Sequence, residues 1–224
     1  VKKTQKAHPL KNYDKEPMAE NELRPEYIIG QFSKYTKSEV VVVTDVGQHQ
    51  MFVALYFKFK KARSHLSSGG LGTMGYSLPA SIGAAYWVKN RRIISFSGDG
   101  GFQMNIQELA TIRNYNLPII IVVFNNGNLG MVKQWQDMNY GGRHSESTYQ
   151  NSLPDFIKLA ESYGHVGIKI TKNSDLSKGL KKAFEMKDRL VFVDIYVDPS
   201  EHVYPMQVAN GSLENMWLSK DEQT

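Results

Sequence analysis

Two short polar stretches, each placed directly after a strand-like run, contain the residue types that could hold a metal ion and a phosphate group. The first is Gly-Asp-Gly-Gly at 98–101, after the run 92–97, and the second is Asn-Asn-Gly-Asn at 125–128, after the run 119–124. The carboxylate of Asp99 and the amide oxygen of Asn126 are hard ligands that suit Mg²⁺, which completes its octahedron with water and substrate phosphate. The glycines beside Asp99 let the backbone approach a phosphate and point N–H groups at it. Together these stretches predict a site for Mg²⁺ and a phosphorylated ligand.

The residues between these stretches are expected to form a strand–helix–strand unit that brings the polar ends together. The run 119–124 is apolar throughout, which is typical of a parallel strand covered on both faces. Residues 104–115 keep helical spacing, and Pro118 ends the helix. A right-handed crossover returns to the same edge of the sheet, where open α/β folds bind ligands. Turn residues in an ordinary βαβ unit would explain Asp99 alone, but Asp99, Asn126 and the glycines together favour a binding site.

The rest of the chain alternates strands with helices, which predicts an α/β fold: a doubly wound parallel sheet of about six strands with helices on both faces. Further strands are expected at 40–44, 165–170 and 190–197, and further helices at about 24–37, 77–89, 129–138, 153–163 and 174–186. The strand 40–44 also ends in a polar stretch, 45–50. If the three strands are neighbours, all three polar ends line one crevice. We interpret residues 1–20 as a linker from a missing middle domain, 21–200 as the binding domain and 201–224 as a tail packing on the surface.

A second glycine-rich stretch offers a competing interpretation. Gly70-x-Gly72-x-x-Gly75 matches the dinucleotide-binding fingerprint, which should follow a strand directly and open a helix. Here the nearest preceding strand ends about twenty residues earlier, and Asp99 is the only acidic residue at a suitable strand end. We therefore predict a loop before the helix 77–89 and no nicotinamide site.

Composition excludes several classes of protein. The chain of 224 residues has no cysteine, so neither a disulfide framework nor thiolate chemistry is available. No apolar run approaches the roughly 20 residues of a membrane helix, and the lysines near the start lack the aromatic interleaving of a nucleic-acid site. The default is a cytoplasmic enzyme that binds neither nucleic acid nor membrane. His8, His65, His144, His165 and His202 have no metal-ligand spacing and are interpreted as structural.

Gly-Asp-Gly at 98–100 followed by Asn-Asn at 125–126 resembles the diphosphate and Mg²⁺ motif of thiamine diphosphate (ThDP) enzymes. Over residues 21–224 the chain resembles the catalytic subunit of the acetolactate synthase (acetohydroxyacid synthase) family. The matching stretches are TDVGQHQM at 44–51, SGGLGTMGY at 68–76, GDG at 98–100 with QMNIQEL at 103–109, NN at 125–126 with LGMVKQWQ at 129–136, SLPDF at 152–156, EHVYPM at 201–206 and MWLSK at 216–220. Residues 130–136 and the tail are specific to this family rather than to ThDP enzymes in general.

The resemblance implies how the matched residues would bind the cofactor. Asp99 and Asn126 would bind Mg²⁺ through their side chains, and Asn128 through its backbone carbonyl. The carbonyl of Val46 would contact the aminopyrimidine, and Met74 would force the cofactor into its bent shape. The remaining implied cofactor-binding residues, which include those around the diphosphate, are Gly47, Gln48, His49, Gly72, Gly98, Gly100, Gly101, Gly130 and Met131. Met131 and Trp135 would line the pocket for the second substrate.

The resemblance also implies the reaction: pyruvate loses CO₂ on ThDP and is joined to a second 2-ketoacid, pyruvate or 2-ketobutyrate, in branched-chain amino acid biosynthesis. Members of the family take an activating glutamate from the N-terminal domain of a neighbouring subunit and carry FAD in a middle domain. Neither domain is expected in these residues, so no catalytic residue is assigned and the chain alone is predicted to be inactive. The implied assembly is a homodimer or tetramer with the active site at the subunit interface, joined by a small regulatory subunit.

Two alternatives remain. One is another ThDP-dependent 2-ketoacid decarboxylase or oxidase, against which Trp135 and the tail argue. The other is a non-catalytic oligomerisation or regulatory module, which would have no reason to keep the metal pair of Asp99 and Asn126.

Overall fold

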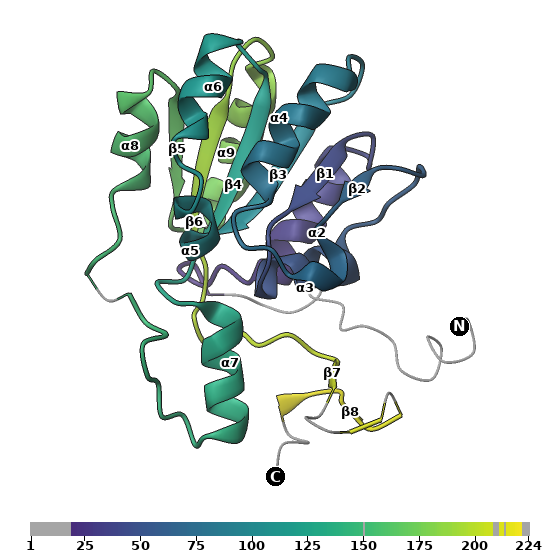
Figure 1. Cartoon of the computed structure of the whole chain (residues 1–224), viewed down its shortest axis with the longest axis vertical. Coiled ribbons are helices and arrows are strands. Elements are labelled where there is room, and N and C mark those ends of the chain that lie inside the picture. Colours follow the sequence, from purple (N-terminus) through teal and green to yellow (C-terminus); the bar gives the residue numbers. More distant parts are fainter. Residues whose placement is uncertain (1–18, 150, 208–210, 213, 221–224) are drawn as a thin grey trace.

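A sheet of six parallel strands forms the centre of the molecule (Figure 1). The computed structural model describes residues 19–149, 151–207, 211–212 and 214–220. The strand order is β2-β1-β3-β4-β6-β5. In that order the strands are His65–Leu66, Val41–Thr44, Ile93–Gly98, Ile119–Asn125, Val191–Tyr196 and Val166–Ile170. The predicted α/β class with a doubly wound parallel sheet is confirmed; most of the predicted linker 1–20 lies outside the described residues.

Helices cover both faces of the sheet because its central strands are apolar on both sides. All seven residues of β4 are buried, and alternate ones pack into two separate cores. One core includes residues of α2 (Pro25–Tyr35), α3 (Gln48–Tyr56) and α9 (Asn173–Glu185). The opposite core includes residues of α4 (Ser77–Trp87), α5 (Asp99–Gln103), α6 (Glu108–Asn114) and α8 (Phe156–Ser162). A two-sided apolar strand of this kind is the expected centre of a parallel sheet.

The strand order brings the three polar strand ends to one place. β1 pairs with β3, where Thr44 lies opposite Phe96, and β3 pairs with β4, where Gly98 lies opposite Phe124. The three strands are therefore consecutive neighbours in the sheet and end at the same edge. The stretches 45–50, 98–101 and 125–128 all begin there, as the sequence predicts.

Two helices differ from the sequence prediction. Residues 48–50, expected only as part of the polar strand end 45–50, form the start of α3, which begins after Gly47. The helix expected at 104–115 begins at Glu108, after the separate short helix α5 and a turn. Asn105 interrupts it, because its side-chain amide donates a hydrogen bond to the carbonyl of Gly75, at 2.7 Å, on the neighbouring loop. The glycine-rich stretch forms a loop with a short 3-10 turn, Gly69–Leu71, before α4, as predicted. The strand β2 lies just before it, however, and was not expected from the sequence.

The segment after β6 passes back over the carboxyl edge of the sheet. Figure 1 shows α7 (Gly130–Asn139) together with β7 (Met206–Gln207) and β8 (Met216–Trp217) below the sheet in that view. β7 and β8 pair as an antiparallel hairpin. Val203 and Met206, just before and within β7, are buried in the core. None of the described helices is both long and apolar enough to span a membrane.

Replacement of Phe192 by alanine is expected to lower the free energy of unfolding by about 3–5 kcal/mol, because it leaves a cavity in the core beside α5. Phe192 is fully buried, and its ring centroid lies 4.9 Å from that of Phe102 and 6.2 Å from that of Phe156. Urea unfolding measures the change. Tyr140→Ala, at an exposed aromatic residue, is the control and should change stability by less than about 0.5 kcal/mol. Equal effects in the two variants would contradict the assigned core.

Candidate functional site

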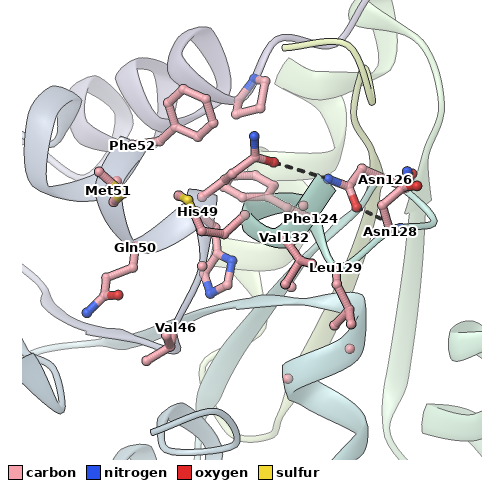
Figure 2. Close-up of a pocket in the computed structure, with 18 of the residues that line it drawn as sticks. Val46, His49, Gln50, Met51, Phe52, Phe124, Asn126, Asn128, Leu129 and Val132 are labelled. Carbon is pink, nitrogen blue, oxygen red and sulfur yellow. Dashed lines mark hydrogen bonds between the residues drawn. The ribbon is translucent and has the colours of Figure 1, made fainter. Parts of the chain in front are cut away.

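One cavity of about 820 Å³ opens at the carboxyl edge of the sheet. Its size lies within the range of small-molecule sites. Figure 2 shows Val46 and His49 on one side of this cavity and Asn126 and Asn128 on another. Every site residue predicted from the sequence lines it: Val46, Gly47, Gln48, His49, Gly72, Met74, Gly98, Asp99, Gly100, Gly101, Asn126, Asn128, Gly130, Met131 and Trp135.

Asp99 is buried at the junction of β3 and β4 and ties the two strand ends together. Its Oδ1 accepts a hydrogen bond from the N–H of Gly100 at 2.7 Å. Its Oδ2 accepts from the N–H groups of Asn126, at 3.1 Å, and Gly127, at 2.8 Å. Burial raises the pKa of Asp99 to about 7, although these backbone donors act in the opposite direction. A cation beside the carboxylate would lower this pKa again, because it stabilises the charged form.

Asn126 and Asn128 lie on the strand end whose backbone N–H groups bond to that carboxylate, and both carry neutral amide oxygens. Asn126 Oδ1 accepts from the N–H of Asn128 at 3.0 Å, and the amide nitrogen of Asn128 donates to the carbonyl of Asn126. The described residues contain no group of three or more His, Cys, Asp or Glu side chains that could hold a metal ion. A set of one carboxylate with neutral oxygens fits Mg²⁺ only when phosphate and water complete the octahedron. The donor chemistry therefore fits a Mg²⁺–phosphate pair rather than a free-standing metal centre.

The glycines of the site allow neighbouring strand ends to pack directly on one another. A Cβ on Gly98 would lie 3.2 Å from His49 Cε1, and a Cβ on Gly101 would lie 2.5 Å from Asp45 Oδ2. Gly47, with φ of 137°, lets the chain turn from β1 into α3 in a conformation that favours glycine. Close contacts with His49 and Asp45 thus favour glycine at positions 98 and 101, and both glycines still line the cavity.

Two buried polar atoms near the cavity have no hydrogen-bond partner among the described residues, His49 Nε2 and Asp45 Oδ2. Burial lowers the pKa of His49 to about 3, so its imidazole is neutral and one ring nitrogen carries a proton. Buried polar groups are rarely left unpaired in folded proteins. An anionic ligand accepting a hydrogen bond from His49 would satisfy one of them, which supports a phosphate group at this position.

Asp45 is a site-organising residue that the sequence analysis did not single out. Its Oδ1 accepts hydrogen bonds from the N–H groups of Val46, at 2.9 Å, and Gly75, at 2.8 Å. It therefore joins the end of β1 to the loop before α4. Burial raises its pKa to about 6. The sequence feature that could have identified Asp45 is its position directly after an apolar strand, within the polar stretch 45–50.

The remainder of the cavity wall is mainly apolar and comes largely from α3, α7 and the C-terminal segment. Met131 and Trp135 lie on α7, and Met74 lies in the loop before α4. The C-terminal segment adds residues that sequence reasoning did not place in the site: Pro205, Met206, Gln207 and Met216. The sequence of this segment shows little periodicity, so no pattern in it predicts that these residues line the cavity. The cavity thus has a polar end at the strand termini and an apolar end under α7.

The other histidines make ordinary structural hydrogen bonds, as predicted, apart from His8, which lies outside the described residues. His65 Nε2 pairs with Thr44 Oγ1 at 3.1 Å, and His165 Nε2 pairs with the carbonyl of Leu109 at 2.9 Å. His144 and His202 each pair with Asp137, at 2.6 and 2.9 Å.

Comparison with known proteins gives one matching family and several close relatives. Residues 45–195 match the family described as "Thiamine pyrophosphate enzyme, C-terminal TPP binding domain". The chain is 53% identical over 204 residues to the acetolactate synthase isozyme 3 large subunit of Escherichia coli (strain K12), covering 90% of this chain and 35% of that protein. It is 51% identical over 201 residues to the acetolactate synthase large subunit of Haemophilus influenzae, covering 90% and 35%. For that of Lactococcus lactis the identity is 42% over 200 residues, covering 88% and 34%. The chain spans about a third of the length of these curated relatives.

Replacement of Asp45 by asparagine is expected to change how stability depends on pH. Because the folded-state pKa of Asp45 is raised, the folded state binds more protons than the unfolded state between about pH 4 and 6, and this residue's contribution to stability falls as pH rises through that window. The free energy of unfolding of Asp45→Asn relative to wild type should therefore increase from pH 4 to 6, by at most ~2–3 kcal/mol, and stay level above it. Urea unfolding in metal-free buffer measures this difference.

The control for this test is Asp188→Asn, at an exposed carboxylate whose pKa is lowered by a hydrogen bond from Arg189. Its difference from wild type should not rise over the same pH window. A constant difference for Asp45→Asn between pH 4 and 7 would show that Asp45 is not held as a protonated buried group.

Proposed function

Because the chain belongs to the thiamine pyrophosphate enzyme family, whose C-terminal TPP-binding domain it contains, we propose that its cavity binds ThDP through a Mg²⁺ ion. The observation that carries this proposal is the junction of β3 and β4. There the buried carboxylate of Asp99 and the amide of Asn126 lie on adjacent strand ends and line the cavity together with the glycines. One charged and several neutral oxygen donors at the carboxyl edge of a parallel sheet are suited to a Mg²⁺-bound diphosphate.

The polar end of the cavity would receive the diphosphate. Asp99 and Asn126 would hold Mg²⁺ with their side-chain oxygens, and Asn128 with its carbonyl. His49 would donate a hydrogen bond from its neutral ring to a phosphate oxygen, which is supported by its unpartnered Nε2. The further residues proposed around the diphosphate are Gln48, Gly98, Gly100 and Gly101.

The apolar end would receive the rest of the cofactor and the substrates. ThDP supplies an electron sink for decarboxylation when bound, and the protein supplies orientation and environment. Met74 would support the bent cofactor from below, Val46 would accept a hydrogen bond from its pyrimidine amine, and Gly47, Gly72 and Gly130 would leave room for it. Met131 and Trp135, which lie together on α7 facing the cavity, would contact the second substrate.

For the longer protein we propose the acetolactate synthase reaction, joining pyruvate to a second 2-ketoacid, pyruvate or 2-ketobutyrate, with loss of CO₂. The support is the similarity to acetolactate synthase large subunits over about nine-tenths of this chain, together with the resemblance of residues 130–136 and 216–220 to that family. FAD in another domain, a small regulatory subunit, a homodimer or tetramer with the active site between subunits, and a cytoplasmic location belong to the same proposal.

These residues by themselves are proposed not to turn over pyruvate. No glutamate lines the cavity among the described residues, so the group that activates the thiazolium ring would have to come from elsewhere. An assay of CO₂ release from pyruvate, with saturating ThDP and Mg²⁺, tests this. Turnover by the chain alone would contradict it.

Isothermal titration of ThDP into the chain, with Mg²⁺ and with EDTA, tests the proposed site. Wild type should bind ThDP in a Mg²⁺-dependent manner, and Asp99→Asn should weaken this binding about 10- to 100-fold, because it removes a charged oxygen ligand while keeping the shape of the side chain. Affinity in EDTA should be equally weak in both proteins.

Asp194→Asn is a matched control for loss of a buried carboxylate. Asp194 lies near the same edge, burial raises its pKa to about 6, and it accepts a hydrogen bond from Asn125, but it does not line the cavity. Its affinity should stay within about threefold of wild type. Equal loss in both variants, or wild-type affinity in Asp99→Asn, would remove Asp99 from the metal site.

A further inference from the structure

Gln134 is the one buried residue of α7, and it is polar. The side chain is completely inaccessible to solvent, which is costly for an amide unless its hydrogen-bonding atoms are paired. Its amide bonds to α3 and to the C-terminal segment, and Nε2 also donates to Met138 Sδ of its own helix at 3.7 Å. Its Oε1 accepts from Gln48 Nε2 at 2.8 Å and from the N–H of Val203 at 2.9 Å, and its Nε2 donates to the carbonyl of Val203 at 3.1 Å.

Gln48, on the other side of this contact, has its amide orientation determined by these partners. Its Nε2 donates both to Gln134 Oε1 and, at 3.1 Å, to the carbonyl of Glu201. Because Gln48 Nε2 donates to Gln134 and Glu201, Gln48 Oε1 faces Asn126, whose Nδ2 donates to it at 3.4 Å. A row of hydrogen-bonded amides thus runs from the half-buried Asn126 through the buried Gln48 and Gln134 to residues 201–203.

We propose that Gln134 is a positioning residue that fixes the orientation of Gln48 and joins the C-terminal segment to the diphosphate end of the cavity. This inference rests on the proposed function, because it concerns how that site is held. Residues 205 and 206 form part of the cavity wall directly after the anchored Val203. Docking of the C-terminal segment and binding of Mg²⁺–ThDP are therefore coupled through the side-chain amide of Gln134. Because such coupling is reciprocal, the docked segment should strengthen cofactor binding, and the bound cofactor should stabilise the docked segment.

A purely structural role for Gln134 would have different consequences. A residue that only filled space in the core would affect cofactor affinity independently of Gln48, so the effects of the two substitutions would add. A residue that acts through Gln48 should lose its effect on affinity once Gln48 is replaced, as a double-mutant cycle detects.

The experiment compares wild type, Gln134→Met, Gln48→Met and the double variant, with Gln136→Met as the matched control. Gln136 is also on α7, and within the described part of the chain its amide bonds to the loop that follows the helix, to Ser145 O at 3.0 Å and Ser147 Oγ at 2.5 Å. Two quantities are measured: the Kd for Mg²⁺–ThDP by calorimetry, and the hydrogen-exchange rate of the Val203 N–H by NMR.

Gln134→Met should raise the Kd about tenfold and speed exchange at Val203 at least tenfold, whereas Gln136→Met should change each by less than about twofold. In the Gln48→Met background, Gln134→Met should raise the Kd by less than about twofold but still speed exchange at Val203. Additive effects on Kd, or an unchanged Kd in Gln134→Met, would overturn the proposal.

Gln134→Glu covers the case in which the methionine variant does not fold. The carboxylate keeps an oxygen that can accept from Gln48 and Val203 and loses the donated bond, so the rise in Kd should stay below that of the Gln48→Met variant. If wild type itself shows no Mg²⁺-dependent binding, the proposed function fails. The Gln134 proposal is then decided without ligand, by Val203 exchange and by the side-chain amide signals of Gln48, which should shift in Gln134→Met and stay unchanged in Gln136→Met.

Discussion

The site depends on one buried carboxylate that accepts backbone hydrogen bonds from two neighbouring strand ends. Asp99 follows β3 directly, and its oxygens receive the N–H groups of Gly100, Asn126 and Gly127. These bonds fix the spacing between the ends of β3 and β4. They do not fully offset the cost of burial, since the pKa of Asp99 remains raised to about 7. A cation bound beside this carboxylate would offset the remaining free-energy cost of burying its negative charge.

Around this carboxylate, the polar and apolar parts of the cavity are held by different means. The polar end is held by side-chain hydrogen bonds that join the strand ends to neighbouring segments: Asp45 to Gly75, Asn126 to Gln48, and Gln48 to Gln134. Glycines at 101 and 130 permit these hydrogen bonds, because a Cβ at Gly101 would collide with Asp45 Oδ2 and a Cβ at Gly130 would collide with Gln48 Oε1. The apolar end is formed by α7 and the C-terminal segment, which lie outside the sheet. The rigid sheet thus positions the proposed metal and diphosphate ligands, and less regular segments enclose the space beside them.

The sequence predicted those features that depend on local pattern. The apolar run 119–124 predicted a parallel sheet, and the polar residues after each strand predicted a shared edge for ligand binding. Every residue assigned to the site from the sequence lines the cavity at that edge. What could not be predicted depends on tertiary contacts. Helix α3 begins inside a polar stretch with no amphipathic signal, and the helix expected at 104–115 is interrupted because Asn105 bonds to Gly75. Glutamine is usually exposed on helices, so the sequence would place Gln134 at the surface, although it is fully buried and bonded to Gln48 and Val203. Met206 and Met216 reach the cavity through a segment without periodicity.

The most direct test of this account is a crystal structure of the chain grown with ThDP and Mg²⁺. The account predicts a metal ion bound by the side chains of Asp99 and Asn126 and by oxygens of the cofactor's diphosphate. The diphosphate should lie against residues 98–101, within hydrogen-bonding reach of His49 Nε2. A cofactor bound elsewhere on the chain, or a diphosphate in this cavity whose metal makes no contact with Asp99, would contradict it.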